Sequence, residues 1–128
     1  MANVERQIVV AVEDDRRVRE SVESLIESAG YAPVMFSSGE EFLRSGSLAA
    51  ATCVITDVWM PGMDGIEMQR RIRLERPNLP VIFISGRYSA ETRQRALQEG
   101  AVEFLYKPFD DVDLLEVIQA VLVNVRQK

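Results

Sequence analysis

Asp57 is the residue of this chain with the clearest capacity for chemistry, because it ends an apolar run in the segment VITDVWMPGMDG. An acidic pair, Glu13 and Asp14, follows an earlier apolar run, and Lys107 follows a later one. In an open parallel sheet, the carboxyl ends of separate strands converge on one crevice, where ligands bind. Three carboxylates and one amine would therefore share a pocket. Such a cluster repels itself, so we interpret it as a candidate site that holds a divalent metal beside a nucleophilic carboxylate.

The elements that must position these residues are five short apolar runs, which are typical of buried strands. Between them, apolar residues recur at helical spacing, as expected of amphipathic helices that cover a sheet. Because strand and helix alternate strictly and the connections are short, the pattern predicts a doubly wound α/β domain of the (βα)5 type with right-handed crossovers. The predicted strands are Ile8–Val12, Ala32–Phe36, Thr52–Thr56, Val81–Ile84 and Val102–Tyr106.

Capping residues mark the ends of several predicted helices. An acidic residue three positions after a capping candidate indicates a helix start, and a glycine after the last periodic residue indicates a stop. The start pairs are Ser38 with Glu41, Asp64 with Glu67, and Asp110 with Asp113, and the stop residues are Gly30 and Gly100. The third predicted helix carries four arginines that we interpret as a solvated face, with a docking stripe for a partner as the alternative: Arg70, Arg71, Arg73 and Arg76.

Length and composition exclude several classes of function. The 128 residues can bury an independent core, so we expect a single domain over residues 1–128. The net charge of −5 argues against direct nucleic acid contact through a phosphate-neutralising surface. No signal segment or membrane-spanning apolar run is present, so we expect a cytoplasmic protein without membrane contact. Histidine is absent, which excludes histidine metal ligands, histidine-activated nucleophiles and a phosphohistidine on this chain.

Four motifs occur in a characteristic order and spacing. They are the acidic pair Glu13-Asp14, the D-x-x-M-P-x-M-D-G block from Asp57 to Gly65, Ser85 after the fourth apolar run, and the K-P-F sequence from Lys107 to Phe109. In these motifs the chain resembles the receiver domain of two-component response regulators, from about Ile8 to about Val123. The resemblance implies a flavodoxin-like three-layer sandwich, with a five-stranded parallel sheet of order 2-1-3-4-5.

By this resemblance, Asp57 is the phosphoacceptor and Mg²⁺ or Mn²⁺ is the cofactor. Asp14 and Asp57 are then direct metal ligands, and Glu13 binds directly or through water. The backbone carbonyl of Trp59 supplies a further ligand. Lys107 pairs with Asp57 in the empty site and with a phosphoryl oxygen in the loaded one, and a cis bond to the next proline aims it. Without the resemblance, the acidic turn at Glu13 could also be a solvated helix cap.

The resemblance also assigns a switch. Ser85 is the hydroxyl that moves to the phosphoryl group, and Phe104 is the aromatic residue that turns inward as this happens. The affected face comprises the helix after the fourth strand, the fifth strand and the last helix, with Gln94, Phe104 and Tyr106 in the activated interface. By pattern alone, Ser85 is equally an ordinary turn residue, and Phe104 a plain strand aromatic.

Trp59 and Arg87 lie two positions after Asp57 and Ser85. In the family that the chain resembles, side chains at these positions flank the phosphoryl group and influence the attack of water on it. A bulky indole should crowd the in-line path of that water, so we expect slow autodephosphorylation. A surface tryptophan without kinetic effect is the alternative.

The resemblance implies a phosphoacceptor in a two-component phosphorelay, loaded by a sensor histidine kinase or a phosphotransfer protein. Hydrolysis of the acyl phosphate reverses the step, so the domain is a switch that catalyses only its own phosphoryl transfer and autodephosphorylation, rather than a turnover enzyme. Further implied partners are a second copy of the chain after phosphorylation, and a fused or separate output domain. The GAVEFL run is similar to receivers of transcriptional regulators with helix-turn-helix output domains.

Three other functions compete with this prediction. A degenerate receiver that acts only as a protein interaction or dimerisation module is one, although all the residues that phosphorylation needs are present. A phosphohydrolase of the haloacid dehalogenase type also uses a strand-end aspartate, but it needs a second Asp as general acid where this chain has Trp59. A flavin-binding flavodoxin-like protein is opposed by the acidic crevice and by the lack of a Ser/Thr-rich phosphate loop after the first strand.

Overall fold

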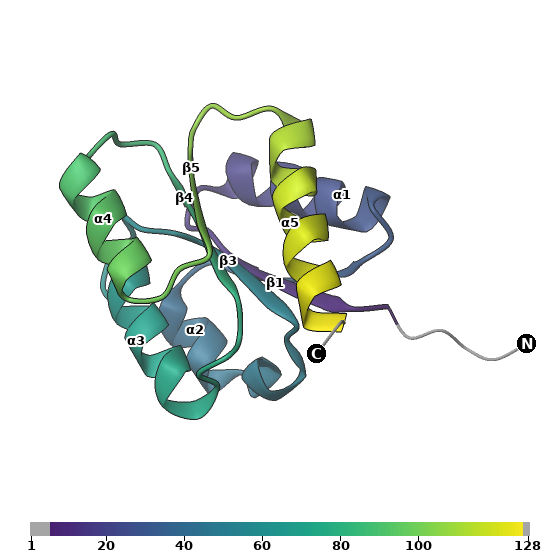
Figure 1. The fold of residues 1–128 in the computed structure, drawn as a ribbon, viewed down its shortest axis with the longest axis horizontal. Helices are drawn as coiled ribbons and strands as arrows, with labels where there is room; N and C mark the ends of the chain where they lie inside the picture. The colour runs from purple at the N-terminus through teal and green to yellow at the C-terminus, as the bar shows by residue number, and fades with distance from the viewer. Residues whose placement is uncertain (1–5, 127–128) are drawn as a thin grey trace, which may run out of the picture.

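A computed structural model describes residues 6–126 of the chain. The strands are β1 (Ile8–Val12), β2 (Ala32–Phe36), β3 (Cys53–Asp57), β4 (Val81–Ser85) and β5 (Glu103–Tyr106). The helices are α1 (Arg16–Ser28), α2 (Gly39–Arg44), α3 (Gly65–Glu75), α4 (Ala90–Gln98) and α5 (Asp111–Arg126), with a short 3₁₀ helix, η1 (Ser47–Ala50). The five strands form one parallel sheet of order β2-β1-β3-β4-β5, which confirms the predicted flavodoxin-like fold (Figure 1). None of the described helices is both long and apolar enough to cross a membrane.

The predicted strand boundaries are correct to within one residue. The third strand begins at Cys53, one position later than predicted. Thr52 precedes it, and both the N–H (2.9 Å) and the hydroxyl (2.8 Å) of Thr52 donate to the carbonyl oxygen of Ile8. At the other end, Asp57 pairs with Ile84 of β4 and is itself the last residue of β3. The candidate nucleophile is therefore anchored by strand pairing rather than carried on a free loop.

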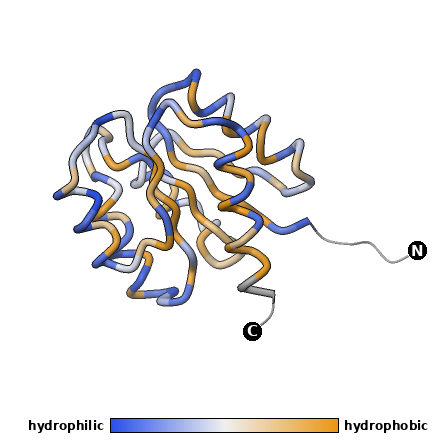
Figure 2. Tube along the Cα trace, turned by 45° about the horizontal axis from the view of Figure 1, so that its top comes forward, coloured by the Kyte–Doolittle hydropathy of each residue, from blue (hydrophilic) through white to orange (hydrophobic). Residues whose placement is uncertain are grey.

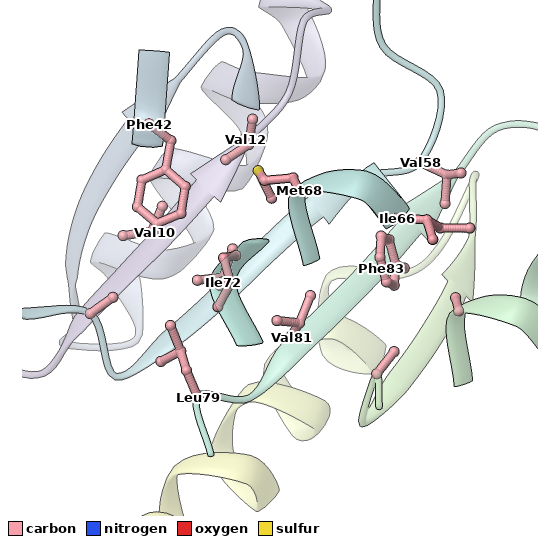
Figure 3. Close-up of a cluster of buried hydrophobic side chains, with 14 of the residues drawn as sticks. Val10, Val12, Phe42, Val58, Ile66, Met68, Ile72, Leu79, Val81 and Phe83 are labelled. Carbon is pink, nitrogen blue, oxygen red and sulfur yellow. The ribbon is translucent and has the colours of Figure 1, made fainter. Parts of the chain in front are cut away.

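Side chains alternate between the two faces of the sheet and so build two hydrophobic layers. On one face, α1 and α5 pack against strand residues such as Val9, Ile55 and Ile84. On the other face, α2, α3 and α4 cover the alternate strand residues; Figure 3 shows Phe42 and Ile72 in this layer. Figure 2 shows the strands as largely apolar segments of the chain. Parallel strands that are covered on both faces need such continuous apolar runs, and each fully buried large apolar side chain contributes about 1.5–3 kcal/mol.

The helix ends follow most of the predicted capping signals. The side chains of Ser38 and Asp64 accept backbone N–H bonds in the first turns of α2 and α3. At α5, the N–H of Asp113 donates to the backbone carbonyl of Asp110 (3.0 Å) instead of to the predicted side chain. Both predicted stop residues follow a helix end in the left-handed conformation that glycine adopts without strain: Gly30 (φ 92°) and Gly100 (φ 104°).

Three of the four arginines near the end of α3 are exposed, as predicted. Two of them also join α3 to the end of α4: Arg70 pairs with the carboxylate of Glu99 (3.1 Å), and Arg73 donates to its backbone carbonyl (2.6 Å). The prediction is wrong for Arg76, which is half-buried and donates to the carbonyls of Leu48 and Ala51 (both 2.8 Å). Carbonyls at a helix end lack partners in the helix itself, so Arg76 stabilises η1.

Candidate functional site

The chemically capable residues meet at the edge of the sheet where the strands end. Asp57 ends β3 and Ser85 ends β4. Glu13 directly follows β1, and Lys107 directly follows β5. Two backbone hydrogen bonds extend the sheet to this edge: Glu13 N–H donates to the carbonyl of Phe36 (3.0 Å), and Lys107 N–H donates to that of Ser85 (2.7 Å). The convergence that the sequence predicted is thus present.

Lys107 bridges two buried carboxylates. Its Nζ donates to Oε1 of Glu13 (2.7 Å) and to Oδ2 of Asp57 (2.8 Å). Glu13 is only 1 % exposed and Asp57 only 6 %, so these charge-assisted hydrogen bonds lie largely out of water. The predicted Lys107–Asp57 pair is present, and the peptide bond from Lys107 to Pro108 is cis, as the resemblance implied. The sequence did not indicate that Glu13 would share the same ammonium.

Burial and charge shift the pKa values of this group. Burial raises the pKa of the Glu13 carboxyl above its ordinary value, despite the hydrogen bond from Lys107, and the negative charge of Asp57 adds to the rise. Burial by itself would lower the pKa of Lys107, but the hydrogen bonds to Asp57 and Glu13 outweigh it and raise that pKa above its ordinary value. The Lys107 ammonium is therefore held in its charged form, while the charged form of the Glu13 carboxyl is less favoured than in water.

Asp14 completes an acidic cluster with Glu13 and Asp57. One carboxylate oxygen from each of the three residues lies within 4.8 Å of the other two. Asp14 is exposed, so the cluster opens to solvent. Oxygen ligands from one or two carboxylates, completed by water, are what Mg²⁺ prefers, and the donor set therefore fits a divalent cation. Asp15, the third acid of the turn, caps α1 instead by accepting two of its backbone N–H bonds.

The two oxygens of the Asp57 carboxylate have different partners. Oδ2 accepts from Lys107, and Oδ1 accepts from the backbone N–H of Trp59 (3.1 Å). The indole of Trp59 is 38 % exposed, and the guanidinium carbon of Arg87 lies 5.0 Å from its ring centroid. The sequence placed Trp59 and Arg87 on two separate loops beside the site. It gave no indication that the two side chains stack on each other.

Ser85 and Phe104 are both buried in this structure. The Ser85 hydroxyl donates to the carbonyl of Arg87 (3.0 Å) and accepts from its N–H (3.1 Å). Within residues 6–126, no hydrogen bond joins this hydroxyl to Asp57. Phe104 is 5 % exposed, and its ring lies 6.0 Å from that of Phe83 and 5.2 Å from that of Tyr106. The ring of Phe104 thus points inward, while the Ser85 hydroxyl is still hydrogen-bonded to the backbone of Arg87 in the loop after β4.

The three residues of the predicted activated interface differ in their exposure. Gln94 is exposed on α4, Phe104 is buried, and Tyr106 is half-buried. Tyr106 stacks on Tyr88, with ring centroids 5.0 Å apart, and Tyr88 is 81 % exposed. The rings of Phe83, Phe104, Tyr106 and Tyr88 therefore form a continuous series from the core to the surface beside α4.

Sequence reasoning missed two residues that shape the loop between β3 and α3. Gly65 begins α3 against the strand, and a Cβ at this position would meet the carbonyl oxygen of Asp57 and the ring of Phe83. From α2, Oε2 of Glu40 accepts the N–H of Met63 (3.2 Å), while Oε1 is buried without a partner among the described residues. The Asp-Gly pair could have indicated a close approach at Gly65. No sequence signal points to Glu40, because an acid in a first helical turn is ordinary.

Two surface hollows differ in their relation to the site. One of about 530 Å³ lies between α1 and the segment after β5, and Lys107 and Gly86 belong to its lining. A larger one of about 1070 Å³ is lined by Thr52, Pro80 and Val102, which precede β3, β4 and β5. The larger hollow is therefore at the opposite edge of the sheet, away from the charged cluster.

Known proteins resemble the chain in sequence and in structure. A family model described as "Response regulator receiver domain" matches residues 9–119. The response regulator protein TodT of Pseudomonas putida is 37 % identical over 115 residues, which are 90 % of this chain and 51 % of TodT. The transcriptional regulatory protein FixJ of Bradyrhizobium diazoefficiens is 32 % identical over 114 residues, 89 % of this chain and 56 % of FixJ. The chain thus spans about half the length of these relatives.

A solved structure shares the fold. The beryllofluoride-activated NtrC4 receiver domain dimer, solved in solution, matches with a TM-score of 0.86 and 30 % identity, over 91 % of this chain and 97 % of that one. The region that the family model matches, residues 9–119, contains the strand ends at which the charged residues converge.

Proposed function

The chain belongs to the response regulator receiver domain family, and on this premise we propose that it is a phosphorylation-controlled switch. Asp57 receives a phosphoryl group from the phosphohistidine of a sensor kinase or phosphotransfer protein. The loaded form then controls an output domain or another partner. The single observation that carries this proposal is the position of Asp57, which accepts from the Lys107 ammonium at 2.8 Å and belongs to an acidic cluster that opens to solvent.

The proposed transfer is a displacement at phosphorus. An oxygen of the Asp57 carboxylate forms a bond to the phosphorus atom, and the P–N bond of the donor phosphohistidine breaks, so that its imidazole leaves and takes up a proton. Lys107 already donates to an Asp57 oxygen, and it moves this hydrogen bond to a phosphoryl oxygen as negative charge accumulates there. A preorganised ammonium of this kind stabilises the transition state without reorganisation of water.

Glu13, Asp14 and Asp57, with the backbone carbonyl of Trp59, are the groups that would hold Mg²⁺ or Mn²⁺. When bound, the cation offsets the negative charge of the phosphoryl oxygens, so that a carboxylate can approach them. The residues of the chain then have distinct tasks. Asp57 attacks, Lys107 pairs with the transferred group, and the N–H of Trp59 orients the Asp57 carboxylate through Oδ1.

The domain is proposed to be a switch rather than a turnover enzyme. Release of the phosphoryl group requires water to attack the acyl phosphate, and a phosphohydrolase would supply a general acid for this step. At the position where haloacid dehalogenase-type enzymes have that acid, this chain has Trp59. We therefore propose that the chain catalyses only its own loading and its slow autodephosphorylation.

The output is proposed to be transcriptional and to act through another part of the protein or a separate partner. FixJ is named a transcriptional regulatory protein and is about twice as long as the matched region, which supports an output domain beyond the receiver. The face of α4, β5 and α5 that contains Gln94, Phe104 and Tyr106 is the proposed signalling surface. Dimerisation through it is supported by the name of the NtrC4 receiver domain dimer. We further propose a cytoplasmic location without direct nucleic acid contact, in keeping with the net charge of −5.

The proposal is tested by titration with beryllofluoride, a mimic of the phosphoryl group, in the presence and absence of Mg²⁺. Binding is followed by the fluorescence of Trp59, the single tryptophan of the chain. We expect a saturable change that requires both components and is lost in Asp57→Asn. Asp64→Asn is the matched control, because it changes a carboxylate of the same loop that only caps α3 and asparagine caps equally well. A response that persists in Asp57→Asn would contradict the proposal. No response in the wild type would favour the alternative function, a degenerate receiver that acts only as a protein interaction module.

A further inference from the structure

Both hydrogen bonds of the Ser85 hydroxyl are made with one neighbour, Arg87. It donates to the carbonyl of Arg87 at 3.0 Å and accepts from the N–H of Arg87 at 3.1 Å. A serine hydroxyl has a single hydrogen to donate, so it cannot also donate to a group on Asp57. Because Ser85 is fully buried, water cannot replace these partners at low cost. The hydroxyl leaves its resting place only if both bonds to Arg87 break.

The side chain of Arg87 is held from the opposite side of the site. Its guanidinium lies over the indole of Trp59 at 5.0 Å, a cation–π contact between the loop after β4 and the loop after β3. Within residues 6–126, the guanidinium has no ion pair and donates no side-chain hydrogen bond. The indole is therefore the one described group that fixes it.

Trp59 is in turn tied to the phosphoacceptor. Its backbone N–H donates to Oδ1 of Asp57 at 3.1 Å. A chain of contacts thus runs from Asp57 through Trp59 and Arg87 to Ser85. Its two ends are the nucleophile and the hydroxyl that the proposed switch has to bring together.

We propose that Arg87 is a positioning residue that holds the Ser85 hydroxyl in its resting place, and that stacking on Trp59 anchors Arg87 there. The inference rests on the proposed function, because the movement that it opposes is that of Ser85 toward a phosphoryl group. The backbone of Arg87 makes the hydrogen bonds to Ser85, and its guanidinium stacks on Trp59. Movement of Ser85 therefore loosens the stack, and loss of the stack favours movement of Ser85. An exposed cation–π contact would shift this equilibrium by about two- to fivefold.

The resting contact is tested without metal or phosphate, by acrylamide quenching of Trp59 fluorescence in the 128-residue chain. Arg87→Gln uncovers one face of the indole, so the quenching constant rises. Ser85→Ala also raises it, although Ser85 itself is buried, because Arg87 loses the hydrogen bonds that hold its backbone. The double variant is quenched no more than Arg87→Gln alone, and Arg87→Lys, which keeps a cation, remains near the wild type.

Ser89→Ala is the matched control, because Ser89 is in the same loop but its side chain accepts from Thr92 N–H and not from Arg87. A wild-type quenching constant in Ser85→Ala would overturn the inference. An equal rise in Ser89→Ala would also overturn it, because the effect would then be a general loosening of the loop.

The consequence for switching is tested with Trp59→Leu, which keeps the charge of Arg87 and removes the ring. The half-saturating concentration of beryllofluoride with Mg²⁺, read from backbone amide signals by NMR, should fall about two- to fivefold. An unchanged or higher concentration would contradict the inference while leaving the proposed function intact. Failure of the wild type to bind beryllofluoride at all would instead refute the proposed function, and the quenching result would still decide whether the resting contact exists.

Discussion

The ammonium nitrogen of Lys107 lies 2.8 Å from Oδ2 of Asp57, although the two residues are 50 positions apart in the chain. The same nitrogen lies 2.7 Å from Glu13, so one cation serves two buried carboxylates, and a third, Asp14, completes the cluster. The three carboxylates thus outnumber the single ammonium group of Lys107. A site with this imbalance should gain stability from a further cation.

Mg²⁺ should therefore stabilise the folded chain. At a free concentration one hundred times its Kd, the free energy of unfolding should rise by about 2.7 kcal/mol, measured by urea denaturation with and without the ion. Asp14→Asn should remove most of this gain because it deletes a carboxylate ligand. Asp15→Asn should keep the gain, because Asp15 caps α1 and asparagine is an equally good cap. Equal responses of the two variants would refute the assignment of Asp14.

Gly65→Ala should destabilise the fold by about 1–3 kcal/mol, the usual cost of overpacking. The added methyl group would meet the Asp57 carbonyl oxygen and the Phe83 ring, both of which belong to the rigid sheet. The midpoint of urea unfolding measures the effect. Gly86→Ala is the control on the neighbouring loop, where the nearest atom is the Lys107 Cδ at 3.9 Å and no comparable loss is expected. A wild-type midpoint for Gly65→Ala would show that the approach of α3 to β3 is not constrained as described.

The contact between Arg70 and Glu99 should make a small, pH-dependent contribution to stability. The hydrogen bond from Arg70 lowers the pKa of Glu99, and the positive charges of Arg70 and Arg73 contribute further. Because the folded-state pKa lies below the unfolded value, the contribution is present above about pH 4.3 and is lost as the pH falls through the folded value. Glu99→Gln should therefore be less stable than the wild type at pH 7, with the difference shrinking in acid.

The check on this contribution is urea unfolding of wild type and Glu99→Gln at a series of pH values. Arg70→Gln should weaken the same pH dependence, since it removes the main cause of the shift. A stability difference that stays constant from pH 7 down to pH 3 would contradict the explanation.

Much of the fold and of the charged site could be predicted from the sequence, because both depend on strong local patterns. Continuous apolar runs identify strands that are buried on both faces, and a charged residue directly after such a run must lie at the edge of the sheet. Asp57 and Lys107 were placed together in this way. Their pairing at 2.8 Å follows from their opposite charges and from their largely buried position at the same strand ends.

The contacts that could not be predicted depend on the relative position of separate loops. The stacking of Arg87 on Trp59 requires the loops after β3 and β4 to lie at a particular distance, which no periodicity specifies. Glu40 reaches the loop of Met63 from a different helix, and Arg76 finds carbonyls of η1 rather than water. The sequence pattern leaves a long polar side chain several possible hydrogen-bond partners, and only the packed structure selects one of them.

Trp59→Asn should lose the phosphoryl group faster than the wild type. The smaller side chain opens the in-line path of water to the acyl phosphate, and we expect the rate constant to rise about tenfold, equivalent to about 1.4 kcal/mol of barrier. The decay of the phosphorylated form after removal of the donor gives this rate. Tyr88→Asn is the control, since Tyr88 is an exposed aromatic residue that stacks on Tyr106 instead. If Trp59→Asn decays no faster than the wild type, the indole does not obstruct the water.

The central claim is that Asp57 accepts a phosphoryl group, and the most direct test is intact mass after incubation with acetyl phosphate, with and without Mg²⁺. Wild type, Asp57→Asn and Asp64→Asn are compared in parallel. We predict a single phosphoryl adduct that requires the metal, forms on wild type and Asp64→Asn, and is absent from Asp57→Asn. An adduct of equal yield on Asp57→Asn, or no adduct on the folded wild type, would contradict the account.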